Sequence, residues 1–319
     1  MNDVKNQTKN ILKTAWNDYS VMFVFIVIIL LCSIVEKNFF TWNNLTAIFR
    51  SCSALGIIAL GMTYIIISGG IDLSVGSTFA CCGAVLLTIQ GAGVPLPIAI
   101  LGSCVFGIII GFFNGFFIAK FALPPFIVTL ATQTLLRSVV KYITNGTTVM
   151  GLQKPAFMAI GNGSLPGGIP IAFVIFLIVA LIMHVVLSKT KFGTYVYALG
   201  GNEVTARYTG IQVDKIKILN YMIIGLMVAI ASTVEVSRMA SVAPTSSGLN
   251  YETEAIIAAV VGGTAFTGGK GKIPGTVIGA IILYIIFNML VHLNVSTFLN
   301  GAVKGSVILI AVLLQKRDK

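Results

Sequence analysis

Long, continuous runs of apolar residues dominate the chain, and apolar and polar positions do not alternate along them. No Asp, Glu, Lys or Arg interrupts residues 73–119, 155–188 or 273–303. A helix that crosses a membrane needs roughly 20 apolar residues, so these intervals have room for several crossings. The strands of an outer-membrane barrel would alternate, and the pattern therefore predicts an all-α, polytopic bundle of transmembrane helices.

Breakers between the runs divide them into about ten membrane segments. The expected segments cover residues 19–35, 51–68, 73–89, 96–119, 121–136, 169–187, 218–234, 255–266, 273–291 and 298–314. The eighth is short, because about 12 residues of helix rise only ~18 Å against a ~30 Å hydrocarbon core, and a half-buried or re-entrant helix is an alternative there. The polar stretches are too short for a soluble domain, so residues 1–319 are expected to form a single transmembrane domain.

Composition and charge narrow the class of protein further. Hydrophobic residues make up 56% of the chain, charged residues only 10%, and the mean hydropathy is +0.97, which excludes a soluble enzyme. The net charge of +11 does not indicate a nucleic-acid partner, because the 21 basic residues are strung between hydrophobic segments. With ten crossings most of these residues fall on one side, which the positive-inside rule makes cytoplasmic, together with both termini.

The five cysteines carry no sign of a metal site or of redox chemistry. They all lie inside expected segments, without metal-ligand spacing and without a histidine pair to complete a site. We interpret them as small core residues. The sequence predicts no metal and no catalytic residue.

A glycine-rich stretch at residues 262–275, GGTAFTGGKGKIPG, has the composition of a phosphate-binding loop but not its spacing. A Walker loop needs Gly, four residues and then Gly-Lys-Ser/Thr, whereas Thr264 stands five positions before Gly269, and Gly271 follows Lys270. We therefore interpret these glycines as tight turns and close helix contacts between the eighth and ninth segments, with no nucleotide bound.

A second glycine-rich stretch, GGIDLSVGS at residues 69–77, contains the only charge between Arg50 and Lys120. The Asp72 carboxylate would cap the third helix by accepting backbone N–H groups of Ser74 and Val75. In the other interpretation it lies at a gate or carries a coupling ion, because ionisable groups at membrane depth are usually functional. The candidate gate residues of this signature stretch are Gly70, Asp72, Ser74, Gly76 and Ser77.

The cytoplasmic loop at residues 188–217 is expected to contain a short helix. Its helical core, residues 202–208, is flanked by Gly200, Gly201 and Gly210. Such a helix lies across the membrane face either as an interfacial anchor or as a docking element for a soluble partner.

With these motifs in place, the chain resembles the permease subunits of bacterial ABC monosaccharide importers. The resemblance spans nearly the whole chain and is carried by NFFTWNNL at 38–45, GMTYIIISGGIDLSVGS at 61–77, YALGGNE at 197–203 and VVGGTAFTGGKGKIPGTVIGA at 260–280. It implies that the loop at 188–217 is the coupling loop that docks into an ATPase. Thr205 and the Tyr208-Thr209 pair depart from the small residues and Leu-Ser common in that loop, which leaves the choice of ATPase open. The coupling residues implied are Gly201, Asn202, Glu203, Ala206 and Gly210.

The resemblance also implies the partners. An importer of this kind has two permease copies, here expected to be a homodimer in the bacterial inner membrane, a separate ABC ATPase that binds ATP-Mg, and a soluble extracytoplasmic sugar-binding protein. This chain would then be no enzyme and hold no cofactor, and its cargo would be ribose or a related pentose or hexose.

Two other classes of transport protein would also fit a polytopic membrane bundle. The alternative is a secondary sugar transporter driven by an ion gradient, for which Asp72 is the serious acidic candidate, since Glu235, Glu252 and Glu254 map toward the outer face. A passive channel is a weaker third class. Neither gives a reason for a docking loop.

A monosaccharide path should offer neutral hydrogen-bonding groups and aromatic faces. Polar residues in membrane helices also commonly bond to a neighbouring helix, which is the competing explanation for each candidate. The candidate path residues are Asn114, Phe126, Thr129, Gln133 and Asn288.

Overall fold

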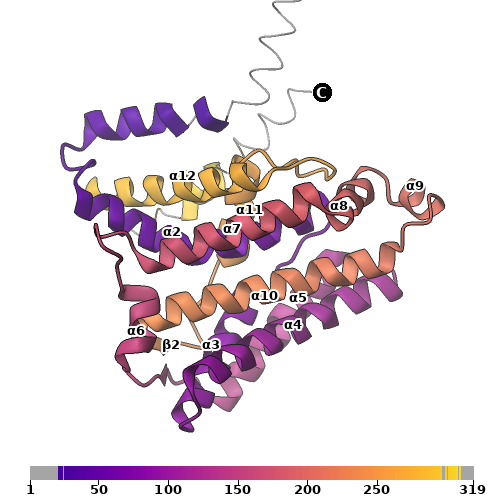
Figure 1. The fold of residues 1–319 in the computed structure, drawn as a ribbon, viewed down its shortest axis with the longest axis horizontal. Coiled ribbons are helices and arrows are strands. Elements are labelled where there is room, and N and C mark those ends of the chain that lie inside the picture. Colours follow the sequence, from indigo (N-terminus) through magenta and orange to yellow (C-terminus); the bar gives the residue numbers. More distant parts are fainter. Residues whose placement is uncertain (1–20, 24, 297–298, 300, 308, 310–319) are drawn as a thin grey trace, which may run out of the picture.

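The structure is a computed structural model that describes residues 21–23, 25–296, 299, 301–307 and 309, and its fold is almost entirely helical (Figure 1). A helix over Val21–Val35, apart from residue 24, precedes the labelled elements. These are α2 (Trp42–Ile67), α3 (Val75–Gly91), α4 (Leu96–Lys120), α5 (Pro125–Ile143), β1 (Val149–Met150), α6 (Pro155–Asn162), α7 (Ile171–Lys189), α8 (Lys191–Gly201), α9 (Glu203–Tyr208), α10 (Val213–Met239), β2 (Ser241–Val242), α11 (Tyr251–Val261) and α12 (Ile273–His292).

Five of the described helices, α2, α4, α7, α10 and α12, are long and apolar enough to cross a membrane. The predicted all-α membrane bundle is confirmed at this level, and the count of ten crossings stays a prediction. The tenth predicted segment, 298–314, lies partly outside the described residues, and residues 301–307 and 309 within it are helical.

Several predicted helix ends were wrong. Helix α2 begins at Trp42 rather than at residue 51, because its polar first turns find partners: the Asn44 amide donates to the Phe39 carbonyl at 3.0 Å. Helix α5 begins at Pro125, where proline suits the first helical position, rather than at residue 121. Helix α11 begins and ends earlier than the predicted segment 255–266.

Helices α2 and α10 form the centre of the bundle. Within an apolar stretch of 18 residues, 67% of residues are buried in α2 and 61% in α10. The corresponding fraction is 28% in each of α4 and α7, which lie at the periphery. Glycines at every fourth position of α4 bring its backbone against α10, so that a Cβ at Gly111 would collide with the Tyr221 carbonyl. This spacing of small residues is how membrane helices approach closely without a hydrophobic driving force.

The helices fall into two halves, residues 42–143 and 213–309, that share one arrangement and run in opposite directions. Across the bundle α12 packs on α2, α2 on α10 and α10 on α4, in the order seen in Figure 1. Antiparallel pairing of α2 and α12 is fixed by hydrogen bonds of 2.7 Å between the Thr63 and Thr276 hydroxyls and 2.8 Å from Asn288 to Asn44. In each half a long helix is followed by a non-helical stretch and then by a shorter helix, α3 or α11.

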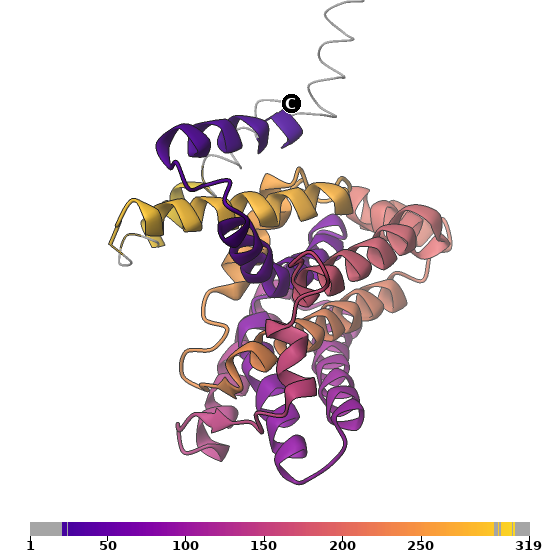
Figure 2. The same ribbon diagram turned by 60° about the vertical axis from the view of Figure 1, so that its left-hand side comes forward.

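The connection between the halves lies along their edge (Figure 2). It contains α6, the peripheral α7, and the pair α8–α9 at one end of the bundle. Strands β1 and β2 pair antiparallel, Val149 opposite Val242, and so fasten the loop after α5 to the end of α10.

Candidate functional site

The first non-helical stretch, residues 68–74, is called here the first interruption. Asp72 is buried there, and its Oδ1 accepts the Ser74 N–H at 2.8 Å and the Ser74 hydroxyl at 2.6 Å. Of the two N–H groups predicted to bond this carboxylate, that of Ser74 does so, and the second donor is the Ser74 hydroxyl; Ser74 itself is the N-cap residue of α3. The gate and coupling-ion interpretation stays a prediction.

A chain of hydrogen bonds leads from this carboxylate into two helices. The Asn114 amide on α4 donates to the Ser74 hydroxyl oxygen at 2.9 Å, and the Thr132 hydroxyl on α5 donates to the Asn114 carbonyl oxygen at 2.6 Å. Asn114 is fully buried and partnered at both ends of its amide. In this state it joins helices, so its predicted contact with substrate would require these bonds to open.

The first turn of α3, directly after the first interruption, meets the loop before α11 at two glycines. A Cβ at Gly76 would collide with the Gly248 carbonyl, and it would lie 2.9 Å from Oε2 of Glu252. Glycine at position 76 therefore lets the two backbones meet. The neighbouring Ser77 hydroxyl is buried without a hydrogen-bond partner among the described residues.

The second non-helical stretch, residues 243–250, is called the second interruption. The Arg137 guanidinium on α5 donates to the Pro244 carbonyl at 3.0 Å and to the Ser247 carbonyl at 2.9 Å. The left-handed conformation of Gly248, φ 73°, turns the chain into α11. Sequence reasoning missed this feature, although a proline and a glycine close together between apolar helices, and a lone arginine within α5, were signals for it.

Both interruptions lie part-way along α10 rather than at its ends. The Tyr221 hydroxyl donates to the Ile71 carbonyl at 3.0 Å, and the Ser232 hydroxyl donates to the Phe79 carbonyl at 2.9 Å. Phe79 in turn packs on Tyr251, the first residue of α11, with ring centroids 5.0 Å apart. Irregular backbone within a membrane bundle is tolerated where protein groups satisfy its polar atoms, as Asp72 and Arg137 do here.

The glutamates at the start of α11 lie close to α3. Tyr251, the first residue of α11, packs on Phe79, and Glu252 lies near Gly76. Glu254 is buried and forms an ion pair with Lys304, whose ammonium lies 4.8 Å from the centre of the Phe287 ring. The expectation that Glu252 and Glu254 map toward the outer face stays a prediction.

The predicted path residues separate into two groups. Thr129 and Gln133 lie one turn apart on α5: the Thr129 hydroxyl donates to the Pro125 carbonyl at 2.8 Å, and Gln133 is half-buried. Phe126 is 54% exposed at the start of the same helix. Asn288 lies near the C-terminal end of α12 and bonds to Asn44, so the structure does not bring it to the interruptions.

The expected helix in the loop at 188–217 is present as α9. The Asn202 Oδ1 caps it by accepting the Thr205 N–H at 2.9 Å, and the left-handed Gly210 follows its end. Within α9 the Ala206 side chain is buried, whereas those of Val204 and Tyr208 are 63% and 88% exposed. Two large side chains, those of Val204 and Tyr208, therefore project from α9, which suits a surface that a protein partner covers.

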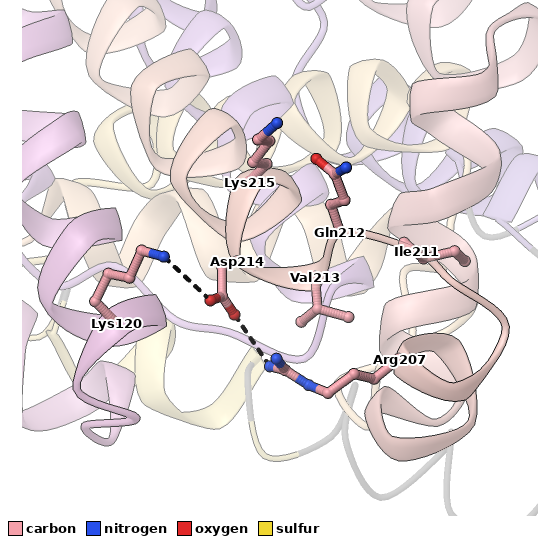
Figure 3. Close-up of a pocket in the computed structure, with 7 residues that line it drawn as sticks. All are labelled: Lys120, Arg207, Ile211, Gln212, Val213, Asp214 and Lys215. Atoms are coloured by element: carbon pink, nitrogen blue, oxygen red, sulfur yellow. Dashed lines mark hydrogen bonds and ion pairs between the residues drawn. The ribbon is translucent and has the colours of Figure 1, made fainter.

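Ion pairs fasten α9 to the bundle. Lys217 on α10 bonds Glu203 at 2.7 Å, and the Arg207 side chain lies 3.0 Å from Asp214. Lys120, at the end of α4, forms a further ion pair with Asp214 at 3.6 Å. Both residues line a cavity of about 260 Å³ (Figure 3). These pairs link the loop to both α10 and α4.

The glycine-rich stretch at 262–275 lies against α8 and has the structural role predicted for it. The Tyr197 hydroxyl donates to the Gly271 carbonyl at 2.7 Å, and the Gly269 N–H donates to the Ile67 carbonyl at 2.8 Å. Gly262 and Gly275 let α11 and α12 meet backbone to backbone.

Residues 44–312 match a family described as the permease component of the branched-chain amino acid transport system. The chain belongs to this permease family. It is 43% identical to the ribose import permease protein RbsC of Escherichia coli over 297 residues, 92% of each chain. It is 40% identical to RbsC of Bacillus subtilis over 292 residues, 91% of this chain and 90% of the relative. The D-allose transport system permease protein AlsC of Escherichia coli is 35% identical over 303 residues, 94% of this chain and 92% of the relative.

These comparisons confirm the predicted resemblance to sugar-importer permeases. The range that matches the permease family, residues 44–312, contains both interruptions, the α8–α9 loop and the glycine-rich stretch. The features that carry the candidate site therefore all lie in the part of the chain that this permease shares with its family.

Proposed function

We propose that this permease is the membrane-spanning subunit of an ATP-driven importer that translocates a monosaccharide, ribose or a related pentose or hexose. The observation that carries the proposal is the identity of 35–43% over more than nine tenths of the chain to permeases named for ribose and allose. A docked helix with exposed apolar residues at one end of the bundle supports the same function, because a permease needs a surface through which an ATPase can act.

The proposed assembly has two copies of this permease in the bacterial inner membrane. An ABC ATPase binds ATP-Mg and hydrolyses it on the cytoplasmic side, where α9 docks through Val204 and Tyr208, and a soluble sugar-binding protein delivers cargo on the other side. Each copy crosses the membrane ten times with both termini cytoplasmic. Gly201, Asn202, Glu203, Ala206 and Gly210 shape the docking loop, with Asn202 as its cap.

In this scheme ATP binding closes the ATPase, and α9 passes the movement to the bundle, which alternates between inward-open and outward-open states. The sugar passes the face of α5 that carries Thr129 and Gln133, next to the two interruptions. Ion-gradient transport has no support among the relatives named above, and the Asp72 carboxylate is already occupied by two donors from Ser74.

The test is uptake of radiolabelled ribose, allose and arabinose by vesicles that contain the permease with or without its ATPase and binding protein. ATP inside and an imposed proton or sodium gradient are compared. Uptake that requires ATP and both partners is expected, and the sugar with the highest rate identifies the cargo. Uptake by the permease alone on a gradient would overturn the proposal.

A further inference from the structure

Tyr221 makes the contact between α10 and the first interruption. Its side chain is 3% exposed, and its hydroxyl donates to the Ile71 carbonyl at 3.0 Å. A Cβ at Gly70 would lie 3.0 Å from the same hydroxyl oxygen, so a glycine at this position leaves room for it. Because residues 68–74 are not helical, this partly buried carbonyl takes its hydrogen bond from a side-chain donor.

One turn earlier on the same side of α10 lies the residue that holds the docking helix. The Lys217 ammonium lies 2.7 and 2.8 Å from the two carboxylate oxygens of Glu203 on α9. Residues four apart on a helix project from one face, one above the other. Lys217 and Tyr221 thus connect α9 and the first interruption through a single turn of helix.

Beyond Ile71 the connection continues into the core. The next residue, Asp72, is bonded to Ser74, and Ser74 is bonded to Asn114 on α4. Thr132 on α5 completes this chain. A displacement of the first interruption therefore reaches α3, α4 and α5 through hydrogen bonds within the bundle.

We propose that Tyr221 is a positioning residue that makes the first interruption follow the docking helix. When the base of α10 moves with α9, the Tyr221 hydroxyl carries the Ile71 carbonyl with it, and α3 shifts against α4 and α5. This role rests on the proposed function, because it needs an ATPase that moves α9.

Tyr64 provides a matched control. It is also fully buried, and its hydroxyl also donates to a main-chain carbonyl, that of Met183 at 2.5 Å. Met183 lies within helix α7, not in an interruption. Tyr221→Phe and Tyr64→Phe each remove one hydroxyl and one such bond.

The experiment compares the wild type and both variants in the assembled importer, in vesicles. The sugar transported per ATP hydrolysed is expected to fall by about threefold or more in Tyr221→Phe, the range expected for residues that carry coupling, and to be unchanged in Tyr64→Phe. Both variants should bind the ATPase as the wild type does. Hydrogen exchange of the backbone amides at 69–74 should respond to ATP-dependent closure in the wild type and lose that response in Tyr221→Phe.

Lys217→Gln breaks the same connection at a partly exposed position and should also lower the amount of sugar transported per ATP hydrolysed. It replaces Tyr221→Phe as the test variant if Tyr221→Phe proves too unstable to assemble. An unchanged ratio in these variants, or an equal fall in Tyr64→Phe, would overturn the proposal. If the wild type itself fails to take up sugar with ATP and both partners, the proposed function is at fault instead.

Discussion

The two interruptions are built alike but held by opposite chemistry. In the first, the Asp72 carboxylate accepts hydrogen-bond donors of the chain, and in the second, the Arg137 guanidinium donates to two carbonyls. Each interruption is also held from the other half of the molecule: Tyr221 of the second half bonds Ile71, and Arg137 of the first half bonds Pro244 and Ser247. These hydrogen bonds therefore join the two halves at the non-helical stretches.

The difference lies in how much charge each half holds inside the bundle. Around the first interruption one carboxylate is bonded to neutral groups, Ser74 and through it Asn114. The second half instead contains an ion pair, that of the buried Glu254 with the half-buried Lys304. Removing one partner of a buried charged pair costs more than removing a neutral hydrogen bond, so the second half should be the more sensitive to substitution.

The largest effect is expected for Lys304→Met, which leaves the Glu254 carboxylate buried and unpaired. The free energy of unfolding should fall by about 3–5 kcal/mol, the usual cost of breaking a buried ion pair from one side. Replacing both residues, in Glu254→Leu/Lys304→Met, removes the uncompensated charge and should restore part of the loss. Thermal unfolding of the purified permease measures both, and a double variant less stable than Lys304→Met would contradict the role of the pair.

Arg137→Met should come next. It keeps the length of the side chain but leaves the Pro244 and Ser247 carbonyls without their donor, and a loss of about 2–4 kcal/mol is expected, together with loss of uptake. Arg50 provides the control, because this half-buried arginine donates to one side chain, the Ser164 hydroxyl, and not to main-chain carbonyls of an interruption. Arg50→Met should change stability by less than about 1 kcal/mol. Equal losses in the two variants would show that the second interruption does not depend on Arg137.

At the first interruption, Asp72→Asn tests the cap against the coupling ion. Asparagine keeps an oxygen that accepts the Ser74 N–H, so the free energy of unfolding should fall by only about 1 kcal/mol and ATP-driven uptake should persist. Asp72→Ala removes the cap and should cost more. Abolished uptake in Asp72→Asn, with the ATPase still bound, would favour the gate or ion interpretation.

The smallest effect on stability is expected on α9, which makes few contacts with the bundle beyond Ala206 and its ion pairs. Tyr208→Asp at this 88% exposed position should leave the unfolding free energy within about 0.5 kcal/mol. It should nevertheless reduce co-purification of the ATPase. Tyr142→Asp, at an 83% exposed position at the far end of α5, should leave the ATPase bound. Retention of the ATPase by Tyr208→Asp would argue against docking through α9.

Local sequence patterns predicted several parts of the candidate site correctly. The short helix α9 was expected because the glycines that flank it, Gly200, Gly201 and Gly210, are local signals; the structure adds that Asn202 is its cap rather than part of its helical core. The structural role of the glycines at 262–275 followed from their spacing. The second interruption was not predicted, since the donor that permits it, Arg137, lies more than a hundred residues earlier in the chain.

The sequence by itself determined the class of this protein. Its apolar runs are continuous, and within a membrane a helix satisfies the backbone polar groups of such a run. It also determined the short helix α9 and the permease resemblance, which depend on neighbouring residues. Only the tertiary structure decided which side chains hold the two interruptions. Distant side chains must satisfy the broken backbone, and here Tyr221 and Arg137 reach across from the opposite half of the molecule to do so.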